Sequence, residues 1–68
     1  MLIRKDTIIK PGDHLFEPNG EKWEVKAIEG KRFKVSNLKT KIQRVVSKDQ
    51  MTIDPVWTLV IMDRRNYW

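Results

Sequence analysis

The sequence predicts a small all-β domain with five short strands. Between residues 21 and 27, apolar Trp23, Val25 and Ala27 alternate with charged residues, which places one set on a buried face and the other in solvent. Turn-forming Pro, Gly and Asn residues recur between the apolar segments, at intervals of roughly 8–12 residues. Short strands spaced in this way are typical of a small barrel or sandwich.

The composition is that of one small domain spanning residues 1–68, in which residues 1–6 and 63–68 are expected to be flexible or to pack as tails. Hydrophobic residues make up 40% of the chain, enough for a core. The chain has no cysteine, so neither disulfides nor thiolate metal sites are available. No signal peptide or long apolar segment is visible, and a cytoplasmic location without membrane contact is expected.

The first part of the chain predicts a strand at residues 14–16, between two turns. The turn before it lies at residues 10–13 and contains Pro11, Gly12 and Asp13. The turn after it ends with Asn19 and Gly20, a pair that favours tight turns with positive φ. This strand should therefore lie beside the start of the next strand, near Trp23.

Residues 21–37 predict the central hairpin. A two-residue turn at Glu29 and Gly30 would pair core positions with solvent positions, which a sheet with one buried face does not tolerate. A loop of three or five residues, with Gly30 at positive φ, restores the match. The expected pairs are Val25 with Val35, Ala27 with Phe33, and Lys26 with Lys34.

A fourth strand is expected at residues 41–46, where Ile42 and Val46 share a face that Arg44 interrupts. Ser47 and Gln50 then have the spacing of a capping box, in which a serine and a glutamine three residues later satisfy each other's backbone N–H groups. Because proline follows soon afterwards, a short 3₁₀ turn is predicted here rather than a longer helix.

The most apolar segment, residues 56–62, predicts the last strand. Its inward side chains are expected to be Trp57, Leu59 and Ile61. The other face carries Val56, Val60 and Met62, which is too apolar for open water. The N-terminal segment or a second copy of the chain should cover it, which makes a homodimer through the last strand one expectation.

This order of elements, with Pro11-Gly12-Asp13 before the first strand, resembles SH3-like small β-barrels, and among them the KOW and Tudor-type modules. The resemblance covers about residues 7–62. It implies a five-stranded barrel with a short 3₁₀ turn before the last strand, and an association with nucleic acid. A Tudor module would also imply an aromatic cage, for which the loops of this chain carry too few aromatic residues.

The residues predict neither an enzyme nor a cofactor or metal site. His14 is the single histidine and is interpreted as a strand residue, because a metal site needs several convergent ligands. Catalytic spacings of Ser with His, paired carboxylates and glycine-rich phosphate loops are also missing from the sequence.

The positive charge is concentrated in the middle of the chain. The net charge is +5, and residues 21–48 alone carry nine basic and three acidic side chains. A surface of this kind can displace counterions from phosphates, so the sequence predicts a non-catalytic module that binds the phosphate backbone of DNA or RNA through the exposed face of the hairpin. The candidate contact residues are Lys22, Lys26, Lys31, Arg32, Lys34, Lys39, Lys41, Arg44, Arg64 and Arg65.

Two alternatives stay open at this point. Tyr67 and Trp68 could stack on bases, although packing back to close the barrel is favoured for so small a core. The whole chain could instead be a protein-interaction module, a regulator or inhibitor that docks on an acidic protein. That function would depend on Val60, Met62 or Trp68 more than on the lysines.

Overall fold

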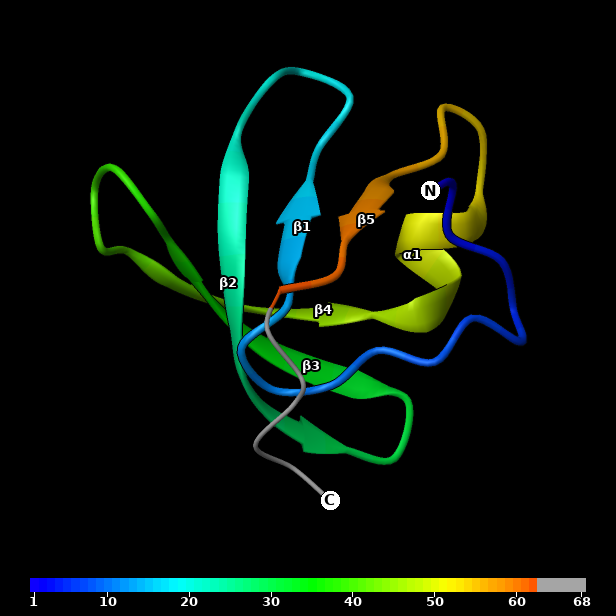
Figure 1. The fold of residues 1–68 in the computed structure, drawn as a ribbon, viewed down its shortest axis with the longest axis horizontal. Coiled ribbons are helices and arrows are strands. Elements are labelled where there is room, and N and C mark those ends of the chain that lie inside the picture. Colours follow the sequence, from blue (N-terminus) through cyan, green and yellow to red (C-terminus); the bar gives the residue numbers. More distant parts are fainter. Residues whose placement is uncertain (63–68) are drawn as a thin grey trace.

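A computed structural model describes residues 1–62, and it contains one antiparallel sheet of five strands in the order β4-β3-β2-β1-β5 (Figure 1). The elements are β1 (His14–Phe16), β2 (Lys22–Glu29), β3 (Arg32–Asn37), β4 (Gln43–Ser47), α1 (Lys48–Thr52) and β5 (Thr58–Val60). The predicted all-β class is confirmed. The sheet is open, because β4 and β5 form its two edges and do not pair with each other.

The short strand β1 holds the two halves of the sheet together. Leu15 pairs with Trp23 of β2 on one side and with Leu59 of β5 on the other, so the predicted neighbourhood of the first strand and Trp23 is confirmed. The turn before β1 is fixed to β2 by two backbone hydrogen bonds, from Gly12 N–H to the Val25 carbonyl and from Val25 N–H to the Asp13 carbonyl. Gly12 adopts a φ of 94°, which side chains rarely allow.

In the hairpin of β2 and β3, the core positions of the two strands are matched by a change within β2, and not by a longer loop. Its turn has only two residues between paired Glu29 and Arg32, with Gly30 at φ 61°. The extra residue is Lys26, which forms a β-bulge between Val25 and Ala27. A bulge shifts the alternation by one, so Val25 and Ile28 both turn toward the core although they are three residues apart.

This bulge decides which predicted pairs occur. Val25 lies opposite Val35, as predicted. The other two pairs are wrong, because beyond the bulge Ala27 lies opposite Lys34, and Ile28 lies opposite Phe33. Lys26 therefore does not face Lys34.

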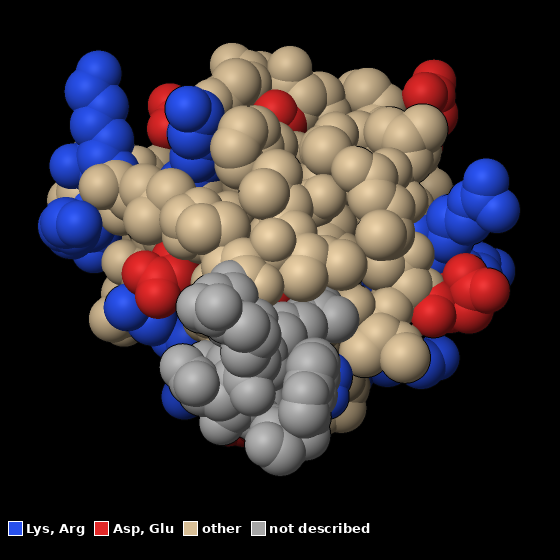
Figure 2. All heavy atoms as spheres, viewed as in Figure 1, with Lys and Arg blue, Asp and Glu red and all other residues tan. Residues whose placement is uncertain are grey.

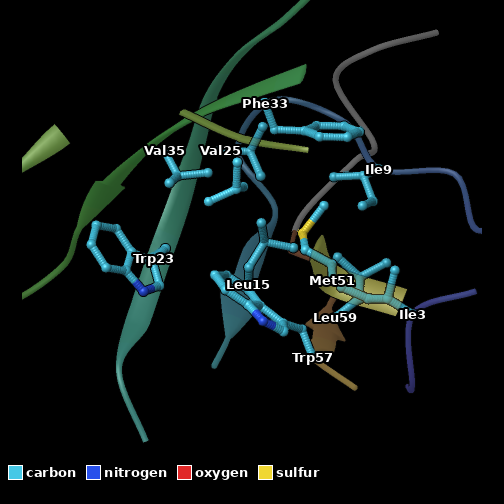
Figure 3. Close-up of a cluster of buried hydrophobic side chains, with 11 residues drawn as sticks. Ile3, Ile9, Leu15, Trp23, Val25, Phe33, Val35, Met51, Trp57 and Leu59 are labelled. Atoms are coloured by element: carbon cyan, nitrogen blue, oxygen red, sulfur yellow. The ribbon is translucent and has the colours of Figure 1, made fainter. Parts of the chain in front are cut away.

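The core lies between the curled sheet, the N-terminal segment and α1, where 11 apolar side chains meet (Figure 3). The predicted inward positions of Trp23, Val25, Val35, Trp57 and Leu59 are confirmed. The full cluster is Ile3, Ile9, Leu15, Trp23, Val25, Phe33, Val35, Val46, Met51, Trp57 and Leu59. Residues of the N-terminal segment therefore contribute to the core directly.

The capping box is confirmed, but it begins a turn of α-helix and not the predicted 3₁₀ turn. The Ser47 hydroxyl accepts a hydrogen bond from Gln50 N–H at 3.2 Å, and Gln50 Oε1 accepts one from Ser47 N–H at 2.9 Å. Met51 anchors the helix in the core. The last strand begins only at Thr58, later than predicted, which leaves room for a full α-turn.

The last strand is shorter than predicted, and Ile61 does not face inward. Pairing with β1 ends where Val60 meets His14, after which the chain leaves the sheet and Ile61 is 46% exposed. Backbone hydrogen bonds from residues 1–3 run along the outer edge of β5, including Ile3 N–H to the Trp57 carbonyl. The N-terminal segment thus covers the edge of β5, whereas Val60 and Met62 stay 37% and 41% exposed. No helix within residues 1–62 is long and apolar enough to cross a bilayer.

Candidate functional site

The described basic residues of the predicted interface fall into separate groups along β2, β3 and β4. Uncharged surface occupies the middle of the face seen in Figure 2, and Lys and Arg side chains project on both sides of it. One group lies at the β3–β4 turn, a second at the middle of the hairpin, and a third at the β2–β3 turn. Arg44 belongs to none of them.

The group at the β3–β4 turn contains Lys22, Lys39 and Lys41. Asn37 is buried and builds this turn, because its Oδ1 accepts hydrogen bonds from the backbone N–H groups of Lys39 and Thr40 at 2.8 and 2.9 Å. All three lysines are exposed, and none forms an ion pair with a residue in the range 1–62. Lys22 Nζ lies 5.3 Å from the centre of the Phe16 ring.

Lys26 and Lys34, at the middle of the hairpin, are both paired with glutamates of β2. Lys26 Nζ lies 3.2 Å from Glu24 Oε1, and Lys34 Nζ lies 3.8 Å from Glu29 Oε1. Both lysines are more than half exposed, so these pairs contribute little to stability. They do reduce the positive charge that this part of the hairpin offers to a ligand.

Arg44 lies on the opposite face of the sheet from Lys34. It pairs with buried Val35, whereas its neighbour Val45 pairs with Lys34, and successive residues of a strand point to opposite faces. Its guanidinium lies over Trp23 and binds Glu17, with Nη1 at 3.4 Å from Oε1. The prediction that Arg44 interrupts the face of Val46 is therefore confirmed, because Val46 pairs with buried Phe33 on the same side of the sheet. The contacts of Arg44 with Trp23 and Glu17 were not predicted.

Arg44 also lines a shallow groove between the β1–β2 loop and the segment that follows α1. The apolar wall of the groove contains Pro18, Ile53 and Trp57, and Glu17 and Asp54 lie beside it. Ile53 is exposed, while Trp57 is largely buried.

At the β2–β3 turn, Lys31 and Arg32 are exposed and form no ion pair with any residue that the structure describes. Lys31 lines a hollow of about 180 Å³ together with Lys5 and Lys48. Sequence reasoning did not include Lys5 and Lys48 in the interface. Lys48 belongs to the basic central stretch, which was the available signal, but Lys5 comes from the other end of the chain and only the fold brings it here.

Apolar side chains are exposed around the last strand. They comprise Met1, Leu2, Val60, Ile61 and Met62. An isolated bridge joins Leu2 to Thr58, so these residues come from two segments that lie side by side. The surface is the one that the protein-interaction alternative would use.

Residues 1–62 contain no group of three or more His, Cys, Asp or Glu side chains that could hold a metal ion. The predicted contact residues Arg64 and Arg65, and the aromatic residues Tyr67 and Trp68, lie outside the described residues. The chain matches no protein-family model, no curated protein and no solved structure. Its function is therefore inferred from its own side chains.

Proposed function

We propose that this protein is a non-catalytic nucleic-acid-binding module whose basic side chains contact the phosphate backbone of DNA or RNA. One observation carries the proposal: the two ends of the β2–β3–β4 hairpins present exposed cations without an ion-pair partner among residues 1–62. These cations are Lys22, Lys31, Arg32, Lys39 and Lys41. A cation without a carboxylate partner can bind a phosphate without first breaking an ion pair. Its binding releases a counterion that was condensed on the nucleic acid.

The spacing of the two ends suits a polyanion. Strand β3 has 6 residues, so its ends lie about 17–20 Å apart at roughly 3.3 Å per residue. Along one strand of a duplex this distance corresponds to roughly five nucleotides at 3.4 Å each. One nucleic-acid strand could therefore contact both basic ends at once, with the paired lysines of the hairpin between them.

We also infer that the architecture is SH3-like. The resemblance to small SH3-like barrels rests on the order of elements along the chain, and the structure has a turn before β1, the β2–β3 hairpin, and α1 between β4 and β5. The sheet order β5-β1-β2-β3-β4 is a further observation that supports this inference. Figure 1 shows β3 and β4 running crosswise behind β1 and β2, so the sheet folds over its own core. This curvature supports a partly open barrel.

The proposal is tested by fluorescence anisotropy of labelled single- and double-stranded oligonucleotides in a salt series. If all five unpaired cations engage phosphates, log K should fall with log salt with a slope of about −4. The double variant Lys39→Gln/Lys41→Gln should flatten this slope by about 1.5. No binding at low salt would contradict the proposal.

The matched control for this test is Lys26→Gln/Lys34→Gln. It removes the same formal charge from the same sheet, but from lysines of β2 and β3 that are already paired with glutamates. We expect a smaller change in the slope than for the Lys39 and Lys41 variant. Equal effects of the two variants would mean that net charge, and not the two basic ends, determines binding.

A second function is supported by the exposed apolar residues Val60, Ile61 and Met62. They would suit docking on a partner protein, which the basic surface would steer toward acidic groups, or association of two copies of this chain. Because residues 1–3 are hydrogen-bonded along the edge of β5, a homodimer would have to use the outer face of this strand. Val60→Asp should then abolish the dimer in light scattering and leave nucleic-acid binding unchanged. A cytoplasmic location stays a prediction.

A further inference from the structure

We propose that the hollow beside the β2–β3 turn, lined by Lys5, Lys31 and Lys48, binds a monoester phosphate group. This pocket extends the proposed function, and it rests on that function only for the source of the phosphate, which would be the phosphorylated end of a nucleic acid. Free inorganic phosphate has the same chemistry and would occupy the same pocket.

Lys48 is the fixed member of the pocket. Its backbone N–H donates to the Lys31 carbonyl at 2.9 Å, which joins the start of α1 to the hairpin turn. Its half-buried side chain donates from Nζ to the Thr7 carbonyl and lies 5.8 Å from the centre of the Phe33 ring. An ammonium group has three N–H donors, and the carbonyl takes one of them. The remaining donors are available for an anion at a position that is already fixed.

Lys5 and Lys31 line the same hollow from two other segments of the chain, and both are exposed. Neither forms an ion pair with any residue in the range 1–62. Asp49 also lines the hollow, but its carboxylate forms no ion pair with these three lysines. Three cations and one anion leave the pocket with an excess of two positive charges.

The chemistry of the pocket favours a phosphate over a carboxylate. Three ammonium groups from separate segments suit an anion with several acceptor oxygens around one centre, whereas a planar carboxylate is better matched by the fork of an arginine. The excess of two positive charges matches a phosphate monoester, which carries about −1.5 to −2 near neutral pH. A backbone phosphodiester carries only one negative charge, so the pocket should prefer a terminal phosphate.

The first test is an NMR titration of the amide signals with sodium phosphate, against sodium chloride at the same ionic strength. We expect saturable shifts at Gly30, Lys31 and Lys48 with phosphate and not with chloride. The variant Lys5→Gln/Lys31→Gln should bind phosphate about fivefold more weakly, as expected for the loss of two exposed ion pairs. This variant spares the bond between Lys48 and Thr7, so the fold should be retained.

The matched control is Lys39→Gln/Lys41→Gln, which removes two lysines from the other end of β3 and should leave phosphate binding unchanged. Absent shifts would overturn the pocket, and so would shifts spread evenly over all the exposed lysines. A loss of affinity in the control equal to that in the Lys5 and Lys31 variant would overturn it as well.

The second test compares one oligonucleotide with and without a terminal phosphate by anisotropy. The pocket predicts tighter binding of the phosphorylated form, and this advantage should disappear in Lys5→Gln/Lys31→Gln. If inorganic phosphate binds at Lys31 and Lys48 but neither oligonucleotide binds, the pocket stands and the nucleic-acid function fails. If both oligonucleotides bind equally and phosphate causes no shift, the pocket fails and the function stands.

Discussion

The guanidinium carbon of Arg44 lies 5.1 Å from the centre of the Trp23 ring, and both side chains bind the same carboxylate oxygen, Oε1 of Glu17. The Trp23 indole N–H donates to this oxygen at 2.9 Å. The positive charge of Arg44 thus serves the fold, because it joins edge strand β4 to the loop that follows β1. In the sequence, Arg44 is grouped with the other basic residues as a candidate nucleic-acid contact, so this structural role was not predicted.

Replacing Arg44 should therefore affect stability more than binding. We expect Arg44→Gln to lower the free energy of unfolding by about 1 kcal/mol, from a cation–π contact and a partly exposed ion pair. Lys34→Gln, on the other face, should change it by less than about 0.5 kcal/mol. Urea denaturation measures both. An Arg44 variant of normal stability with weaker oligonucleotide binding would instead place Arg44 in the interface.

Lys41 combines backbone strain with a proposed contact to nucleic acid. Its φ of 65° lies in the left-handed region, where a residue other than glycine is disfavoured by about 1 kcal/mol. Lys41→Asn should raise the melting temperature slightly, because asparagine tolerates this conformation better, and it should weaken oligonucleotide binding through the lost charge. Lys39→Asn, its control, should weaken binding without the gain in stability. Equal melting temperatures of the two variants would exclude the strain at Lys41.

The fold was predictable where apolar and polar residues alternate regularly along a strand. It was not predictable where a single extra residue interrupts that alternation. Trp23, Val25 and Val35 are buried as their alternation requires. The bulge at Lys26 carries no signal of its own, because any residue can occupy it, and it changes every pair between it and the turn. A tight turn with a bulge and a longer loop without one restore the same parity, so the sequence alone does not distinguish them.

The helical turn α1 should depend on its cap. Ser47→Ala removes the oxygen that accepts the Gln50 N–H, and we expect it to lower the free energy of unfolding by about 1 kcal/mol. Ser47→Asp retains an acceptor at this position and should keep most of the stability. Thermal unfolding followed by circular dichroism measures the difference. If alanine and aspartate behave alike, the cap is not what holds α1 in place.

The candidate site was predictable as a set of charges but not as an arrangement. The excess of basic residues in the central stretch is visible in the sequence, and the exposure of Lys22, Lys39 and Lys41 follows from strand and turn positions. The proximity of Lys5 to Lys48 is not visible, because 42 positions separate them and only the packing of the N-terminal segment brings them together. Whether the charge of a lysine is neutralised by a neighbouring glutamate, as that of Lys26 is by Glu24, likewise depends on side-chain geometry.

Asp13 should be among the most sensitive positions of the chain. It is 1% exposed, and its two carboxylate oxygens accept hydrogen bonds from the backbone N–H groups of Lys10 at 3.0 Å and Met62 at 3.4 Å. The carboxylate thus joins the turn before β1 to the segment that leaves β5. Hydrogen bonds to a charged group contribute about 1.5–3 kcal/mol, and their loss would leave two partly buried N–H groups without this acceptor.

We therefore expect Asp13→Ala to lower the free energy of unfolding by about 2–3 kcal/mol, a large part of the roughly 3–10 kcal/mol expected for a chain of this size. Asp13→Asn keeps the shape and one acceptor oxygen, so its loss should be smaller. The control is Asp6→Ala, which removes an exposed carboxylate from the same N-terminal region and should change stability by less than about 0.5 kcal/mol. Urea denaturation of the three variants separates the effects, and equal midpoints for Asp13→Ala and Asp6→Ala would show that the buried carboxylate does not hold the two segments together.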